Sequence, residues 1–191
     1  AVTHYDPKKI KDDPCMVAEE HKKFACRYVG LGSYQDIFQK YDIFKSEYLT
    51  AAKSIADRGC LFLYHNHSAE FEKFPDGRNV LERLRDETSP DILGFIPDCF
   101  WIQHAGADPV SFIRDFAGRI PCVHFKDMGI VGGERRMLPC GSGNMDHERL
   151  IAACADSGCE YVLIELDDTY GQDPFVSLLS GLEYLRSLGL S

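Results

Sequence analysis

Three residues that could bind a metal ion, Asp98, His124 and Glu165, each lie in or directly after a short run of apolar residues. Ionisable groups inside such runs are costly to bury unless they are paired or bound to a metal. If the runs are successive parallel strands, their ends bring two carboxylates and one imidazole to a common rim. This donor set suits Mn²⁺, Mg²⁺ or Co²⁺, with Zn²⁺ as a further candidate. Taken singly, Asp98 could cap a loop, His124 could be a core histidine and Glu165 could form a salt bridge. Together the three predict a divalent metal site.

A second group of polar residues, His65, Asn66, His67 and Glu70, follows the apolar run at 61–64. If the strand continues, His65 and His67 point the same way because strand side chains alternate. His65 could then supply a fourth metal ligand, while His67 contacts the substrate. Glu70 is the rival fourth ligand, and a polar loop without a ligand is the alternative to both.

Apolar runs of strand length recur along the chain and alternate with helical patterns. The expected strands are 28–31, 61–64, 93–96, 122–125 and 161–166, with a sixth ending near Thr3-His4. A helix is expected over 38–57, with Gly59 as its C-cap, and Asp108, Asp146 and Asp173 are expected N-caps of later helices. The alternation predicts an α/β fold with a parallel sheet. Every expected strand ends in residues that could do chemistry, and Gly32-Ser33 end the strand at 28–31. In a closed barrel all strand ends meet at one site, whereas in an open sheet only the strands beside a switch point do, so a closed barrel is favoured.

Composition predicts one soluble globular domain, with 45% hydrophobic and 27% charged residues in 191. A formal net charge of −9 argues against a nucleic acid or an anionic membrane as partner. No apolar run approaches the roughly 20 residues of a membrane span, and the first residues show no signal peptide, so a cytoplasmic location is expected. The eight cysteines are dispersed without a C-x-x-C pair and are expected to be mostly buried thiols.

Residues 12–188 resemble the sugar phosphate isomerase/epimerase family, whose members have xylose-isomerase-like TIM barrels. The resemblance rests on Tyr64-His65-Asn66-His67 with Glu70-Phe71, on Ala105-Gly106-Ala107-Asp108-Pro109, on Val123-His124-Phe125-Lys126-Asp127, on Gly141-Ser142-Gly143-Asn144 and on Asp173-Pro174-Phe175. It implies that Asp98, His124 and Glu165 are the ligands on the sixth to eighth barrel strands and that His65 holds the fifth-strand position. Many sugar epimerases of the wider family have Glu at that position.

The resemblance also implies an incomplete (β/α)8 barrel. Five to six parallel strands are expected over 1–191, without counterparts of the first two βα units. Strand edges left open in this way would favour a homo-oligomer or a partner chain that covers them.

The function implied is that of a metal-dependent sugar isomerase or epimerase, which removes a proton next to a carbonyl through a metal-stabilised enediolate. Glu165 or His67 would remove the proton, and Lys126 would face the enediolate oxygen or form a salt bridge to Asp127 or another acid. Expected substrate contacts are His65, Asn66, Trp101, Asp127 and Asp167. Arg135-Arg136, beside Gly132-Gly133, could hold a phosphate or be solvated loop charge. A lyase of the inosose dehydratase or C-glycoside-cleaving type is one alternative, since His65 replaces a carboxylate, and a non-catalytic truncated barrel is another.

Overall fold

The computed structural model describes residues 2–32 and 34–190, so the predicted role of Ser33 at a strand end lies outside the described residues. The chain divides into two compact units. The first comprises the residues up to Ile96 together with Gly118–Pro121, and the second comprises Pro97–Ala117 and Cys122 onward. Each unit is built around its own parallel strands.

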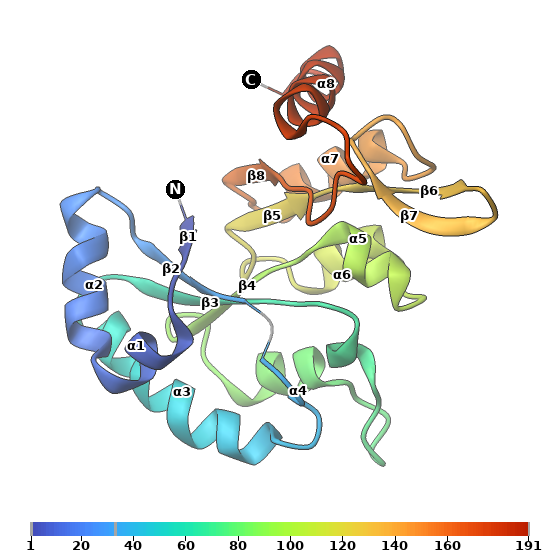
Figure 1. The fold of residues 1–191 in the computed structure, drawn as a ribbon. Helices are drawn as coiled ribbons and strands as arrows, with labels where there is room; N and C mark the ends of the chain where they lie inside the picture. Colours follow the sequence, from blue (N-terminus) through green and yellow to red (C-terminus); the bar gives the residue numbers. More distant parts are fainter. Residues whose placement is uncertain (1, 33, 191) are drawn as a thin grey trace. The chain divides into compact units, whose positions relative to one another are not determined.

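The first unit contains a four-stranded parallel sheet in the order β1-β2-β3-β4 (Figure 1). Its strands are β1 (Val2–His4), β2 (Tyr28–Leu31), β3 (Leu61–His65) and β4 (Leu93–Ile96). Its helices are α1 (Pro7–Asp12), α2 (Pro14–Lys23), α3 (Tyr41–Ala56), the 3-10 turn η1 (Ala69–Phe71) and α4 (Val80–Glu87). Pairing in register, such as Val29 opposite Phe62 and Leu63 opposite Gly94, aligns the carboxyl ends of the strands at one edge.

Aromatic packing joins helix α3 to this sheet. Phe44 is fully buried and stacks on Tyr48, with ring centroids 5.0 Å apart. The Phe44 ring also meets Tyr64 of β3 edge to face at 5.3 Å, a favourable geometry for aromatic pairs. The apolar face that helix periodicity predicted within 38–57 is therefore the face that holds β3 in place.

The second unit pairs two parallel strands, β5 (Cys122–Phe125) and β8 (Tyr161–Ile164). Its helices are α5 (Cys99–His104), α6 (Pro109–Asp115), α7 (His147–Asp156) and α8 (Pro174–Ser187). Asp108, Asp146 and Asp173 are N-caps of α6, α7 and α8, as predicted, and each side chain accepts a backbone N–H of the first turn.

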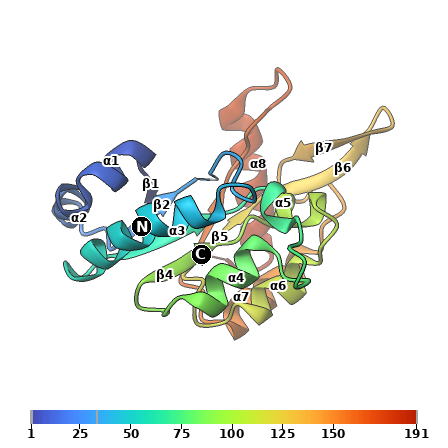
Figure 2. The ribbon, with the colours of Figure 1, turned by 90° about the horizontal axis from the view of Figure 1, so that it is seen from below.

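An antiparallel hairpin, β6 (Asp127–Val131) and β7 (Glu134–Leu138), extends from the second unit as a two-stranded ribbon (Figure 2). Gly132 and Gly133 form its turn with φ of 63° and 86°, the left-handed conformation that a two-residue hairpin requires. The prediction of a loop here was wrong: Arg135 and Arg136 belong to β7, and the Arg136 guanidinium lies 4.8 Å from the centre of the Tyr170 ring.

The described residues thus contain six parallel strands, which confirms the predicted α/β fold of an incomplete barrel. Strand pairing within residues 2–32 and 34–190 does not close into a ring. No disulfide joins the eight cysteines, all of which are described, and six of them are buried. Among the described helices, none is long and apolar enough to cross a membrane.

Candidate metal centre

The strand ends of the second unit gather five side chains, which we call the carboxylate cluster: Asp98, His124, Lys126, Glu165 and Asp167. The backbone explains why they meet. Asp98 and His124 form a parallel bridge, in which the His124 N–H donates to the Pro97 carbonyl at 2.9 Å. The Glu165 N–H donates to the Phe125 carbonyl at 3.2 Å, which continues the β5–β8 ladder past its last residues. The predicted convergence of Asp98, His124 and Glu165 is present in the structure.

Lys126 lies at the centre of the carboxylate cluster and is fully buried. Its Nζ is 2.8 Å from Oδ2 of Asp98, 2.8 Å from Oε2 of Glu165 and 2.9 Å from Oδ2 of Asp167. Of the two partners expected for this lysine, it therefore pairs with other acids and not with Asp127. The indole N–H of Trp101 donates to Oδ2 of Asp167 at 3.3 Å, so this predicted substrate-binding pair is joined directly.

Lys126 and Glu165 both keep their charges inside the cluster. Burial alone would lower the pKa of Lys126, but the charge of Asp98 and the hydrogen bonds to Asp98, Glu165 and Asp167 outweigh it and raise that pKa. Burial alone would raise the pKa of Glu165, but the hydrogen bonds and charges of His124 and Lys126 lower it well below its ordinary range. Nδ1 of His124 lies 2.7 Å from Oε2 of Glu165.

The cluster also has the composition of a divalent metal site. Asp98, His124 and Glu165 each present a ligand atom, and these atoms lie within 4.8 Å of one another. Two carboxylates and an imidazole are ligands that Mn²⁺, Mg²⁺, Co²⁺ and Zn²⁺ all accept. The three residues fit such an ion. The Lys126 ammonium contacts two of the same carboxylate oxygens, Oδ2 of Asp98 and Oε2 of Glu165.

Asp98 also begins helix α5. Its Oδ1 accepts the Trp101 N–H at 3.0 Å, which is the hydrogen bond of an N-cap. The capping role and the ligand role considered for this residue are thus compatible, since one oxygen caps the helix and the other faces Lys126.

Asp127, a predicted substrate contact, is hydrogen bonded to the backbone around it. Its carboxylate is 1% exposed and accepts four N–H groups at 2.8–3.0 Å, those of Met128, Gly141, Gly143 and Met145. A Cβ at Gly143 would lie 2.4 Å from Oδ1 of Asp127, so only glycine fits there. Asp127 therefore holds the loop that follows β7.

Substitution of Asp127 by alanine is expected to lower the free energy of unfolding by about 2–3 kcal/mol, because buried N–H groups would lose their acceptor. Urea denaturation followed by circular dichroism would measure the loss. Asp146→Ala is the matched control: it removes an exposed N-cap with one N–H bond and should cost about 1 kcal/mol. Equal losses in the two variants would contradict the role given to Asp127.

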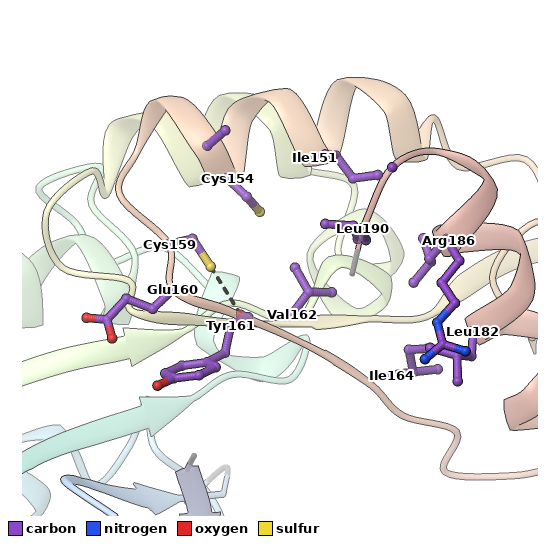
Figure 3. Close-up of a pocket in the computed structure, with 13 residues that line it drawn as sticks. Ile151, Cys154, Cys159, Glu160, Tyr161, Val162, Ile164, Leu182, Arg186 and Leu190 are labelled. Atoms are coloured by element: carbon purple, nitrogen blue, oxygen red, sulfur yellow. Dashed lines mark hydrogen bonds between the residues drawn. The ribbon is translucent and has the colours of Figure 1, made fainter.

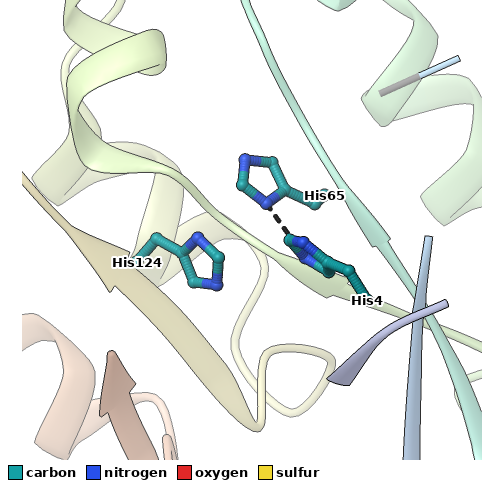
Figure 4. Close-up of side chains that lie close together, drawn as sticks. All are labelled: His4, His65 and His124. Carbon is teal, nitrogen blue, oxygen red and sulfur yellow. Dashed lines mark hydrogen bonds between the residues drawn. The ribbon is translucent and has the colours of Figure 1, made fainter. Parts of the chain in front are cut away.

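The first unit carries the other predicted site residues. His65 is buried at the end of β3, and its Nδ1 lies 3.2 Å from Nε2 of His4 at the end of β1 (Figure 4). The rings of His65 and His67 meet edge to face at 5.4 Å. Asn66 is buried and donates to the His67 carbonyl at 3.3 Å. His4 was placed at a strand end by the sequence, but nothing there indicated its contact with His65.

Glu70, the rival fourth ligand, is fully buried and has a structural role. Its Oε1 accepts the hydroxyl of Tyr64 at 2.7 Å, and its Oε2 accepts the His67 N–H at 2.9 Å. Burial raises the pKa of Glu70, and these hydrogen bonds only partly oppose that effect. Both carboxylate oxygens of Glu70 therefore hold this loop in place.

The chain has a parallel α/β fold with two carboxylates and an imidazole at its strand ends, which is the arrangement of a barrel-type fold with its site at the carboxyl ends of the strands. The family model of the xylose isomerase-like TIM barrel matches residues 19–188, and the chain belongs to this family. The predicted resemblance is thereby confirmed. Comparison with curated proteins gave no match.

Solved structures share the fold. A sugar phosphate isomerase/epimerase from Parabacteroides distasonis is 22% identical, with a TM-score of 0.81 over 98% of this chain and 70% of that one. The IolI protein with a bound zinc atom is 13% identical, with a TM-score of 0.73 over 98% and 75%. A xylose isomerase-like TIM barrel protein from Mycobacterium smegmatis, in complex with magnesium, is 14% identical, with a TM-score of 0.71 over 96% and 68%. At these identities the likeness shows the fold alone.

Proposed function

We propose that the chain carries the site of a metal-dependent sugar isomerase or epimerase, which removes the proton next to a carbonyl group. The observation that carries the proposal is the carboxylate cluster, in which the ligand atoms of Asp98, His124 and Glu165 lie within 4.8 Å of one another beside a buried lysine. Membership of the xylose isomerase-like family supports the same reaction class. The substrate would be a small sugar or sugar derivative.

Asp98, His124 and Glu165 would hold the ion, and His65, at the end of β3, is proposed as the fourth ligand because the family resemblance implies a ligand at this position. A bound Mn²⁺, Mg²⁺, Co²⁺ or Zn²⁺ supplies a Lewis acid that makes the proton next to a carbonyl easier to remove. The donor set supports this choice of ions without selecting one of them.

Proton transfer, charge stabilisation and sugar contacts are assigned to residues of the carboxylate cluster and to other predicted site residues. Glu165 is kept ionised, which is the form that accepts a proton, although the low pKa makes it a weak base. His67, a half-buried imidazole, is the second candidate for proton transfer. Lys126 stays protonated, so it would stabilise negative charge on a substrate oxygen and not exchange protons. Trp101, Asp167 and Asn66 are proposed to contact the sugar.

Hydrogen exchange tests this proposal directly. Purified protein with Mn²⁺ would be incubated with a panel of ketoses and inososes in D₂O, and deuterium incorporation next to the carbonyl would be followed by NMR. We expect exchange with at least one sugar, and its loss in Glu165→Gln. Glu160→Gln, the same change at an exposed residue just before β8, is the control and should retain exchange. A metal-loaded protein that exchanges no sugar in the panel would argue for the non-catalytic alternative.

Lyase chemistry of the inosose dehydratase or C-glycoside-cleaving type is the second candidate. It is favoured by His65, an imidazole where many sugar epimerases have a carboxylate. The same incubation separates the two, because a dehydratase releases water and gives an unsaturated product, whereas an isomerase or epimerase conserves the mass of the sugar.

We further propose that residues 1–191 act as a single domain in the cytoplasm and that the chain self-associates. Helix α8 exposes Phe175, Val176 and Leu179, whose side chains are 82%, 65% and 52% exposed. Adjacent exposed apolar side chains of this kind are typical of interaction surfaces. Sedimentation velocity would measure the association, and a monomer at all concentrations would contradict it.

A further inference from the structure

Among the described residues, five helices end with the same turn, in which a backbone N–H bonds to the carbonyl five residues earlier. The donor and acceptor pairs are Cys26 and His21, Cys60 and Ile55, Ala107 and Ile102, Cys159 and Cys154, and Leu190 and Leu185. This turn is a Schellman motif, and a contact between the side chains of the two bonded residues commonly accompanies it. At the end of α7 both of these side chains are cysteines. At the ends of the other four helices at least one of the two is another residue.

The end of α7 shows the whole motif. The Cys159 N–H donates to the Cys154 carbonyl at 3.0 Å, and the Gly158 N–H donates to that of Ala155 at 3.4 Å. Gly158 has φ of 76°, the left-handed conformation that turns the chain back over the helix end. The motif therefore brings Cys154 and Cys159 together through backbone geometry that does not depend on either thiol.

The two thiols interact and differ in character. The Cys154 thiol hydrogen bonds to that of Cys159, which lowers the pKa of Cys159 and raises that of Cys154. Sγ of Cys159 also lies 3.1 Å from the Tyr161 carbonyl oxygen (Figure 3). A thiol of lowered pKa carries more thiolate, the form that reacts with oxidants.

Both cysteines line a cavity of about 350 Å³ between α7, β8 and α8 (Figure 3). Cys154 is buried, with 4% of its surface exposed, whereas Cys159 is only half-buried. Cys159 is therefore the more accessible of the two thiols to a small solute, and Cys154 is the more protected, as a resolving thiol would be.

We propose that Cys154 and Cys159 form a redox pair that hydrogen peroxide converts to a disulfide. In the first step the Cys159 thiolate attacks one peroxide oxygen, the O–O bond breaks, and the released hydroxide takes a proton to leave as water. Cys159 is then a sulfenic acid. In the second step the Cys154 sulfur attacks the Cys159 sulfur, and the S–O bond breaks to release a second water that takes up the Cys154 proton. Two thiols are oxidised and one peroxide is reduced.

The pair uses no residue of the carboxylate cluster, so the inference is independent of the proposed function. Its chemistry requires neither a metal ion nor a sugar. If the protein showed no isomerase activity or bound no Mn²⁺, the proposal for the two cysteines would still stand. If the two cysteines formed no disulfide, the proposal for the carboxylate cluster would still stand.

Peptide mass spectrometry tests the pair on the intact chain. Reduced protein would be treated with one to two equivalents of hydrogen peroxide, alkylated with iodoacetamide and digested with trypsin. Cleavage after Arg149 and Arg186 gives a peptide with Cys154 and Cys159 as its two cysteines, and cleavage after Arg58 and Lys73 gives one that contains Cys60. We expect the first peptide to lose two hydrogen atoms, about 2 Da, and to resist alkylation, while Cys60 is alkylated as in the untreated protein.

Two variants give the order of the steps. In Cys154→Ser the sulfenic acid on Cys159 has no resolving thiol, so dimedone should label Cys159 after peroxide treatment. In Cys159→Ser no dimedone adduct should form on Cys154. Cys60→Ser is the matched control, because Cys60 holds the equivalent position of a motif whose partner is Ile55. Full alkylation of both cysteines after peroxide treatment, or oxidation of Cys60 at the same rate, would overturn the proposal.

Discussion

Replacement of Asp98 by asparagine is expected to weaken Mn²⁺ binding by at least about 100-fold, since loss of outer-shell partners alone costs 10- to 100-fold. Asparagine keeps the side-chain oxygen that caps α5 through the Trp101 N–H, so the helix should still form. What it removes is the negative charge and the second oxygen that faces Lys126. Calorimetric titration with Mn²⁺ would measure the affinity, and circular dichroism would follow the fold.

Asp108→Asn is the control for this experiment. Asp108 caps α6 in the same way but is not part of the carboxylate cluster, so its replacement should leave the affinity for Mn²⁺ unchanged. Wild-type affinity in the Asp98 variant would show that the metal centre is assigned to the wrong residues.

The second large effect is expected for Lys126→Met. Lys126 is fully buried and is the shared cation of Asp98, Glu165 and Asp167. Removing one partner of a buried ion pair costs about 3–5 kcal/mol, because the remaining charge is left uncompensated. We therefore expect the metal-free variant to lose stability by about that amount in urea denaturation.

Divalent metal should reverse much of this loss. Without the ammonium, the two carboxylate oxygens that it contacts become available to the ion, so Mn²⁺ should bind the variant more tightly than the wild type and stabilise it more. Lys22→Met removes an exposed pair with Glu19 and should cost less than about 1 kcal/mol. A Lys126 variant that Mn²⁺ does not stabilise would mean that the lysine and the metal do not share a site.

The strands could be predicted closely because buried parallel strands consist of almost uninterrupted apolar residues. β2, β4 and β5 have the predicted bounds, while β3 continues to His65 and β8 ends at Ile164, before the predicted Leu166. The convergence of Asp98, His124 and Glu165 was predictable for the same reason, since the carboxyl ends of parallel strands share one edge of the fold.

Side-chain partners were harder to predict, because they depend on contacts between segments far apart in the chain. The sequence placed Asp127 beside the site, but its four N–H donors include groups 14 to 18 residues away, in a loop whose path no local pattern reveals. The hairpin was missed although Gly132-Gly133 is a known turn signal. A spacing of five residues between Cys154 and Cys159 has meaning only once the helix is known to end between them.

The charges gathered around Lys126 have one further consequence. Counted as formal charges, with His124 taken as neutral, the three carboxylates and the ammonium sum to −2, which one divalent cation would balance. In a partly buried site this imbalance repels anions, because charges there are screened less than in water. A phosphorylated or acidic sugar would therefore meet an unfavourable potential until the ion is in place, whereas a neutral sugar would not. Charge alone thus sets an order of addition, with the metal entering before an anionic substrate.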